Sequence, residues 1–320
     1  MGAYNAIVIG GGHNGLILAA YLAKRGQRVL LLEAATTPGG LAAEREFHPG
    51  FKSNVAHTVS HFSQQVALDL DLKAHGFVPN ATPLATVGLN RDGQHVVIAD
   101  GSVQGIDDDD LGAYQRYDRQ MRRFGEVLQP FWGKTMPGIG ARGLRELLTF
   151  AHLGARIRFS GKETMRELLR VASLPARDLM DEHFSNDLLK TTLAWDGLIG
   201  AKMAPRSPNS AVLAMLYRLS EPTAGGHSLP ADGVNGLVSA LQSAAEAAGV
   251  DMRFDAEVDR VLITEDRSGL TASGVQLANG QKLEADRIIS AVDPKQTFLK
   301  LVGVRYLDIG FTNRIRRLRC

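Results

Sequence analysis

The sequence predicts a mixed α/β protein in which a Rossmann-like domain is split by a mainly helical region. Residues 6–33 have the pattern of a strand, a glycine-rich turn, a helix and a second strand. Residues 163–219 are then mostly of helical spacing, and the α/β pattern returns after Leu229. A parallel sheet built from both parts of the chain, with a helical insertion between them, accounts for these three observations.

The first stretch, AIVIGGGHNGLILAAYLAKRGQRVLLLE, is typical of dinucleotide binding. Ala6–Ile9 and Val29–Leu32 are short apolar runs of the kind that form buried parallel strands. Gly10 permits a tight exit from the first strand and Gly12 lets a pyrophosphate approach the backbone. Gly15 lets the following helix lie close to the sheet.

Two further features concern the ligand. The helix that follows the glycines presents unpaired N–H groups and the positive end of its dipole to phosphates. Glu33, about 20 residues after the glycines, is placed to accept hydrogen bonds from the adenosine ribose. Gly39 and Gly40 come soon after this acid, an arrangement typical of FAD-binding Rossmann domains. This favours FAD over NAD, and an NAD(P)-dependent dehydrogenase remains the alternative.

The segment after the nucleotide motif carries few chemical signals. We expect a helix, a hairpin and a second helix at Val66–Leu72, Ala85–Asn90 with His95–Ala99, and Ala113–Leu128. Asp107–Asp110 lack the alternating ligands of a calcium loop, so we expect them to begin the second helix. A second GxGxxG, at Gly138, Gly140 and Gly143, follows prolines instead of a strand, which indicates a loop and no second nucleotide site.

Helical spacing dominates the middle of the chain. The expected helices are Leu144–Leu153, Glu163–Ala172, Pro175–Phe184, Asn186–Trp195 and Ala211–Leu219. Ser185 or Asn186 is suited to cap one of them. For Trp195 and Asp196, core packing and a helix cap are the simplest interpretations. Because this block interrupts the α/β pattern, we expect it to cover the substrate.

The α/β pattern resumes with an expected helix, Leu237–Ala248, that ends at Gly249. The expected strands are Asp251–Phe254, Val258–Ile263, the hairpin Leu270–Leu277 with Lys282–Leu283, and a buried strand Arg287–Val292. The predicted division assigns 1–80 and 226–295 to the FAD-binding domain. It assigns 81–225 to a hairpin and helical substrate region, and 296–320 to the start of a C-terminal substrate segment.

Composition limits the possible functions. The 320 residues include 44% hydrophobic and 22% charged residues, with a net charge of +2, which gives no reason to expect a nucleic-acid partner. No apolar run is long enough to span a bilayer, and no signal peptide is expected, which favours a cytoplasmic location. Cys320 is the single cysteine, so we expect no disulfide framework, CxxC redox pair or cysteine-based metal site. Redox chemistry must then come from a bound cofactor.

Several motifs together resemble one group of flavoproteins. GGGHNGL, LLEAATTPGG, EFHPGF, LDLKAHG, HFSNDLLKTTLAWDGLIG, PRSPNSA and ADRIISAVDP are similar to the phytoene-desaturase-related group of FAD-dependent oxidoreductases. The resemblance implies a two-domain flavoprotein of the amine-oxidase and phytoene-desaturase superfamily. It implies FAD contacts from Gly10, Gly11, Gly12, His13, Asn14, Gly15, Glu33, Ala34, Gly39, Gly40, Leu41, Val258, Ala291 and Val292.

The chain also departs from this group. Leu41 stands where relatives often carry arginine, and Asn54 where they often carry an acid. Relatives continue to a second FAD motif that is absent here, so we expect a truncated form. His57 is the candidate proton-transfer residue near the flavin, with His61 close behind it, although a structural role is the simpler interpretation.

The expected activity is hydride transfer to flavin from a C–H or C–N centre of an organic, apolar or amine-like small molecule. A truncated, catalytically silent nucleotide-binding or interaction protein is the alternative from another class.

Overall fold

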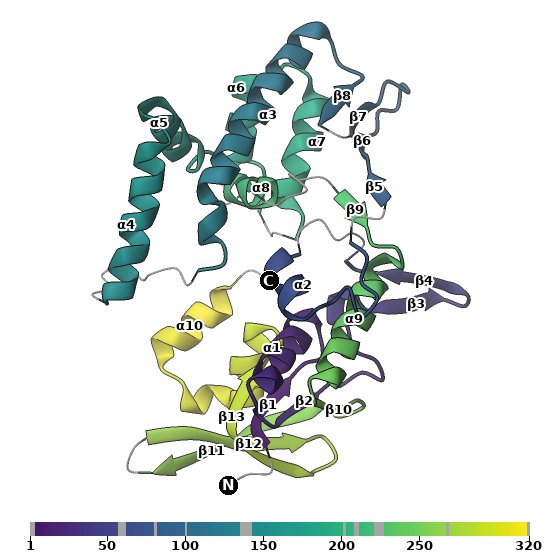
Figure 1. The fold of residues 1–320 in the computed structure, drawn as a ribbon, viewed down its shortest axis with the longest axis vertical. Helices are drawn as coiled ribbons and strands as arrows, with labels where there is room; N and C mark the ends of the chain where they lie inside the picture. The colour runs from purple at the N-terminus through teal and green to yellow at the C-terminus, as the bar shows by residue number, and fades with distance from the viewer. Residues whose placement is uncertain are drawn as a thin grey trace. The chain divides into compact units, whose positions relative to one another are not determined.

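The computed structural model describes residues 4–56, 62–79, 82–99, 101–134, 143–200, 203–207, 211–220, 227–266 and 269–318. The chain divides into two compact units. Unit 1 comprises residues 1–82 and 228–320, and unit 2 comprises residues 83–227. The chain crosses between them near the short strands β5 (Thr82–Leu84) and β9 (His227–Leu229) (Figure 1).

Unit 1 contains a six-stranded sheet in the order β10-β2-β1-β13-β12-β11. Its strands are β1 (Tyr4–Ile9), β2 (Val29–Leu32), β10 (Asp251–Arg253), β11 (Val258–Asp266), β12 (Gly269–Leu277) and β13 (Lys282–Ser290). β1 runs parallel to both β2 and β13, which brings Ala6 beside Val29 on one side and beside Arg287 on the other. The predicted α/β architecture with a parallel sheet is confirmed.

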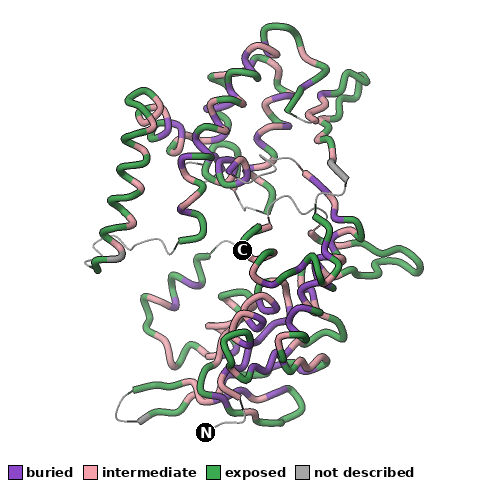
Figure 2. The backbone as a smooth tube through the Cα atoms, in the orientation of Figure 1, coloured by how far each residue is buried: buried purple, intermediate pink, exposed green. Residues whose placement is uncertain are grey.

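Side chains of β1 and β2 alternate between two buried clusters. Val8 and Leu31 pack with the helices α1 (His13–Lys24) and α9 (Gly233–Ala247), which contact one another. Ile7 and Leu30 point into the other cluster, which β11 and β12 help to form. Both faces of these strands are therefore covered, which explains their continuous apolar sequence and their buried trace in Figure 2.

The remaining elements of unit 1 lie outside the six-stranded sheet and the helices α1 and α9. They are the 3₁₀ turn η1 (Gly40–Ala42), the hairpin β3 (Glu44–His48) and β4 (Phe51–Asn54), α2 (Gln64–Asp69), the π-helical segment η3 (Gln296–Gly303), the 3₁₀ turn η4 (Val304–Tyr306) and α10 (Ile309–Arg317). Residues 296–318 thus belong to the same compact unit as the sheet.

Two strand predictions are corrected. The expected separate strands at 282–283 and 287–292 are one strand, β13, because it pairs antiparallel with β12 first and parallel with β1 afterwards. Its second half is exposed to half-buried and not fully buried as expected. The β3–β4 hairpin was not anticipated, because its exposed residues show no apolar alternation.

Unit 2 is mainly helical. Its helices are α3 (Asp108–Leu128), α4 (Leu144–Phe159), α5 (Lys162–Val171), α6 (Ala176–His183), α7 (Asp187–Leu198) and α8 (Ala211–Leu219), with the 3₁₀ turn η2 (Gln129–Phe131) after α3. A three-stranded antiparallel sheet joins β6 (Thr86–Gly88), β7 (Val96–Ala99) and β8 (Ser102–Gln104). The acidic run begins α3 as expected, with Asp107 as its N-cap, and Asn186, one of the two expected caps, caps α7.

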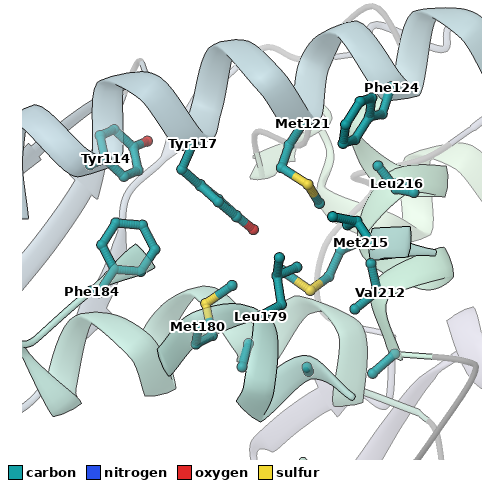
Figure 3. Close-up of a cluster of buried hydrophobic side chains, with 14 of the residues drawn as sticks. Tyr114, Tyr117, Met121, Phe124, Leu179, Met180, Phe184, Val212, Met215 and Leu216 are labelled. Carbon is teal, nitrogen blue, oxygen red and sulfur yellow. The ribbon is translucent and has the colours of Figure 1, made fainter. Parts of the chain in front are cut away.

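The core of unit 2 lies between α3, α6 and α8 (Figure 3). Met121 and Phe124 of α3, Leu179 and Met180 of α6, and Leu216 of α8 are almost completely buried in it. Among the described residues, no helix is at once long and apolar enough to cross a membrane.

Candidate cofactor-binding site

The turn after β1 leaves no room for side chains at two positions. Gly10 has a φ of +102°, and a Cβ there would come within 2.8 Å of Val292 Cγ1. A Cβ on Gly15 would overlap the Gly10 carbonyl oxygen, because α1 starts directly against the turn. Both positions therefore require glycine, as the sequence pattern predicted.

A second glycine segment, Gly39 and Gly40, lies against the glycine turn that follows β1. The Gly39 N–H donates to the Gly11 carbonyl at 2.9 Å, and Gly12 and Gly39 form a parallel bridge. A Cβ on Gly40 would come within 3.3 Å of Gly12 Cα. The backbone after β2 is thus held beside the N-terminus of α1, with no side chain between the two segments.

The N-terminus of α1 is open to an anion. Its N-cap residue is Gly12, which has no side chain to cap the helix, and the first turn contains no acidic residue. The N–H groups of this turn and the positive end of the helix dipole therefore favour a phosphate. His13 is half-buried and burial lowers the pKa of its imidazole, which favours the neutral ring. Asn14, which follows it, is exposed.

Glu33 is fixed next to this turn by backbone groups. One carboxylate oxygen accepts from the Gly11 N–H at 2.6 Å and the other accepts from the Ala35 N–H at 2.9 Å. The Glu33 N–H donates to the Arg253 carbonyl, and the Glu33 carbonyl accepts from the Ala256 N–H, both at 2.9 Å. A carboxylate is therefore held in place where a Rossmann domain recognises the ribose.

The other predicted cofactor residues occupy separate positions. Ala291 lies at the glycine turn, where its N–H donates to the Ile9 carbonyl at 2.8 Å, and Val292 packs over Gly10 as described above. Val258 is buried at the start of β11. Ala34 and Leu41 are exposed. The contacts that all these residues would make with a cofactor remain predictions.

Some predicted residues lie outside the described part of the chain. These are His57 and His61, the histidines expected near the flavin, and Gly138 and Gly140 of the second glycine motif. The last glycine of that motif, Gly143, is the N-cap residue of α4.

These features fit a dinucleotide. The glycine cradle, formed by Gly10–Gly12, Gly39 and Gly40, presents backbone without side chains. Beside it, the α1 N-terminus supplies N–H donors and the Glu33 carboxylate supplies an acceptor. Donors for the pyrophosphate and an acceptor for the ribose are the groups that the ADP half of FAD requires.

Unit 2 contains a charged cluster that sequence reasoning missed. Arg218 is 9% exposed, and its Nη1 donates to Asp196 Oδ1 at 2.6 Å. His227 Nε2 lies 3.1 Å from the same oxygen and 2.9 Å from Arg218 Nη2. The Nε of Arg218 is buried, with no hydrogen-bond partner among the described residues. Arg218 and His227 thus share one carboxylate oxygen of Asp196.

This cluster corrects two expectations. Asp196 forms an ion pair in place of a helix cap, and Trp195 is 54% exposed instead of packed in the core. Both residues lie in the second half of α7, and the partners of Asp196 are Arg218 of α8 and His227. A pairing between segments more than twenty residues apart leaves no local spacing signal.

Comparisons with known proteins agree with this geometry. A family model described as flavin-containing amine oxidoreductase matches residues 15–297. The mouse pyridine nucleotide-disulfide oxidoreductase domain-containing protein 2 is 29% identical over 338 residues, covering 98% of this chain and 58% of that protein. The phytoene desaturase of Cercospora nicotianae is 27% identical over 320 residues, covering 94% of this chain and 47% of that protein.

The fold is similar to that of an oxidoreductase from Methanosarcina mazei. The TM-score is 0.59 at 17% identity, over 98% of this chain and 65% of that chain. The chain therefore spans less than two thirds of the length of each of these three proteins.

Proposed function

The chain belongs to the flavin-containing amine oxidoreductase family, and from this premise we propose that it binds FAD through unit 1 and transfers a hydride to it from an organic substrate. FAD is the cofactor of this family, in line with the sequence-based expectation. The resemblance to phytoene-desaturase-related flavoproteins is likewise confirmed at the level of the family.

One observation carries the assignment of the cofactor site. The backbone of Gly39 and Gly40 lies against Gly11 and Gly12, beside the carboxylate of Glu33. A nicotinamide dinucleotide needs only the first glycine turn and the acid. The second glycine segment adds side-chain-free backbone next to the first turn, an arrangement typical of FAD-binding Rossmann domains, and so favours FAD.

Each group of the chain has a distinct task in this proposal. The α1 N-terminus holds the pyrophosphate and Glu33 holds the ribose hydroxyls. FAD, when bound, supplies a two-electron acceptor for a C–H or C–N centre. The protein contributes orientation and excludes water, so no base or metal has to be found in the chain.

We propose a small organic substrate that is apolar or amine-like. Two names support this class: the family is described as amine oxidoreductases, and one relative is a phytoene desaturase.

The first experiment measures flavin retention by the purified chain. The protein is mixed with FAD and desalted, and its absorbance spectrum is recorded. We expect a bound, yellow flavin. A chain that stays colourless but binds NADH or NADPH would contradict the proposal and support the nicotinamide-dependent alternative. A flavin that stays oxidised with every apolar and amine substrate tried would support the silent form.

A substitution at Glu33 tests the site itself. Glu33→Ala removes a charged acceptor, and we expect FAD affinity to fall by about 1.5–3 kcal/mol, which is roughly 10- to 150-fold. Glu33→Gln keeps one acceptor oxygen and should lose less. Glu265→Ala, an exposed glutamate of β11, is the matched control and should leave affinity unchanged. Equal affinities for wild type and Glu33→Ala, measured by flavin fluorescence titration, would refute the assignment.

A further inference from the structure

His13 is not explained by the stability of the helix that it begins. It is the first residue of α1, directly after the N-cap residue Gly12. A cation at this end of a helix opposes the helix dipole, so α1 gains nothing from a protonated imidazole here. Acidic residues are the ones that stabilise a first turn by their charge. A titratable base at this position therefore points to a ligand that supplies the negative charge.

The His13 ring is free to meet such a ligand. The Cα–Cβ bonds of a helix tilt toward its N-terminus, so we expect the side chain of a first-turn residue to lean toward the open end. His13 is half-buried, and its ring has no hydrogen-bond partner among the described residues. The open end of α1 is where the glycine cradle and the helix N–H groups favour a phosphate.

Burial keeps the His13 ring neutral in the free protein. It lowers the pKa of the imidazole, because a half-buried ring has lost hydration that the charged form needs. Carboxylates near the ring would raise its pKa, so they do not cause the lowering. The titratable groups on the elements around α1 are carboxylates and phenols, namely Glu33 after β2, Asp69 of α2, Asp232 and Glu246 at the ends of α9, Asp293 after Val292, Tyr4 of β1 and Tyr21 of α1 itself, with Lys24 in the last turn of α1.

A pyrophosphate at the same place reverses this balance. Its negative charge favours the imidazolium, so the pKa of His13 is higher in the complex than in the free protein. Between these two pKa values, binding of the ligand takes up a proton. Affinity therefore rises as the pH falls through the bound-state pKa, and it levels off below the free-state pKa, which lies under about 6.5.

We propose that His13 takes up a proton when the FAD pyrophosphate binds at the α1 N-terminus, so that a charged imidazole and the helix N–H groups hold the cofactor together. The proton comes from solvent, and no bond of the cofactor is broken. This inference rests on the proposed function, because it requires FAD in the glycine cradle. It goes further by making retention of the cofactor depend on pH. Asn14, the next residue of the turn, does not titrate and cannot supply this dependence.

Titration of FAD into the full chain at several pH values tests the inference. We expect the affinity from flavin fluorescence to rise about tenfold from about pH 8 to about pH 5.5, which corresponds to a rise of about one in the pKa of His13 on binding. Calorimetry in two buffers of different ionisation enthalpy should show uptake of up to about one proton. ADP-ribose, which has the same pyrophosphate diester and no flavin, should show the same pH dependence.

Variants of His13 separate its charge from its shape. His13→Gln keeps a hydrogen-bonding side chain that does not titrate. It should match the wild type within about twofold at about pH 8 and bind about tenfold more weakly at about pH 5.5. His13→Lys keeps a positive charge and should bind tightly at both pH values.

His75→Gln is the matched control. His75 is another histidine of unit 1, and its Nδ1 lies 2.9 Å from the Ser243 hydroxyl of α9. This variant should retain the pH dependence of the wild type. Circular dichroism checks the folding of each variant, and the proton count on the wild type does not depend on any variant.

The outcomes distinguish this inference from the proposed function. Wild-type affinity for FAD that is constant across the pH range would overturn the inference and leave the proposed function standing. The same follows if His13→Gln keeps the full pH dependence, or if ADP-ribose binding shows none, because the titrating group would then lie elsewhere. A chain that binds neither FAD nor ADP-ribose at any pH would refute the proposed function and the inference together.

Discussion

The glycine turn of unit 1 and the helix junction of unit 2 solve the same problem by different means. In unit 1, α1 is fixed against β1 by backbone contacts that require Gly10 and Gly15. In unit 2, one side chain of α3 accepts hydrogen bonds from the segment that leads into α7. The buried carboxylate of Asp110 accepts from the Ser185 N–H at 2.9 Å, from the Ser185 hydroxyl at 3.0 Å and from the Asn186 N–H at 2.7 Å.

This difference determines which substitutions and which pH changes each unit tolerates. A close backbone approach accepts only glycine, so the requirement is strict and tied to position. The contact made by the Asp110 carboxylate depends on its charge and on hydrogen-bond donors, so the stability that it contributes varies with pH. Both tryptophans of the chain, Trp132 and Trp195, lie in unit 2, so their fluorescence reports that unit separately.

The largest effect is expected at Gly15. Gly15→Ala forces a Cβ into the Gly10 carbonyl and should destabilise unit 1 by about 3–5 kcal/mol, with loss of FAD binding. Tryptophan fluorescence of unit 2 during urea unfolding should change little. Gly154→Ala is the control in unit 2, because a Cβ meets nothing within 4 Å in α4, and it should stabilise by about 0.5–1 kcal/mol. A Gly15→Ala chain that binds FAD normally would show that the contact between α1 and β1 does not require glycine at this position.

A smaller, pH-dependent effect is expected at Asp110. Burial raises its pKa, but the hydrogen bonds from Ser185 and Asn186 outweigh burial and hold the pKa below the ordinary value. The folded-state pKa is thus lower than the unfolded one of about 3.9. The resulting stability is fully present above pH 3.9 and is lost as the pH falls through the folded-state value.

Asp110→Asn should therefore cost about 2–3 kcal/mol at pH 7, measured by urea unfolding with tryptophan fluorescence. The cost should shrink as the pH is lowered below about 4, because the wild type loses the same charge. Asp109→Asn, an exposed neighbour in the first turn of α3, is the control. A cost that does not depend on pH would mean that charge is not what fixes this junction.

The smallest effect is expected at Tyr117. Its hydroxyl is buried among apolar side chains in Figure 3, with no hydrogen-bond partner among the described residues, and burial raises its pKa. Tyr117→Phe should leave stability unchanged or raise it by up to about 1 kcal/mol. In unit 1, Tyr21 donates to Asp69 at 2.5 Å, so Tyr21→Phe should cost about 1 kcal/mol by circular dichroism. A loss of stability in Tyr117→Phe would indicate a bound partner for this hydroxyl.

The two units also differ in how far their sequences predict them. The positions of β1, β2 and the glycines followed from local pattern, because each requirement falls on a fixed position in a short segment. The same holds for α8, whose predicted limits match the structure. The sequence predicts Gly39 and Gly40 only as a pair typical of FAD-binding Rossmann domains. It does not predict that their backbone contacts Gly12.

The features that the sequence did not predict share a physical cause, which is that their partners are distant in the chain. Asp110 was assigned only to the start of α3, since nothing near it in sequence indicates that Ser185 donates to it. The ion pair of Asp196 with Arg218 was missed for the same reason. The sequence predicts two strands in place of β13 because Glu284 and Asp286 interrupt its apolar residues. The strand is continuous because it pairs with β12 and then with β1, which are distant in sequence.

The position of β1 in the sheet has a consequence for the order of events on the ribosome. Ala6 pairs with Val29 on one side, but its other neighbour, Arg287, is translated at least about 14 s later at 5–20 residues per second. Helical units rich in local contacts fold within microseconds to milliseconds. Unit 2 can therefore complete its fold while β1 still has an open edge. Ala291 and Val292 reach Ile9 and Gly10 only after that edge closes, so the cofactor site of the proposed function is complete only after residue 292 has been translated.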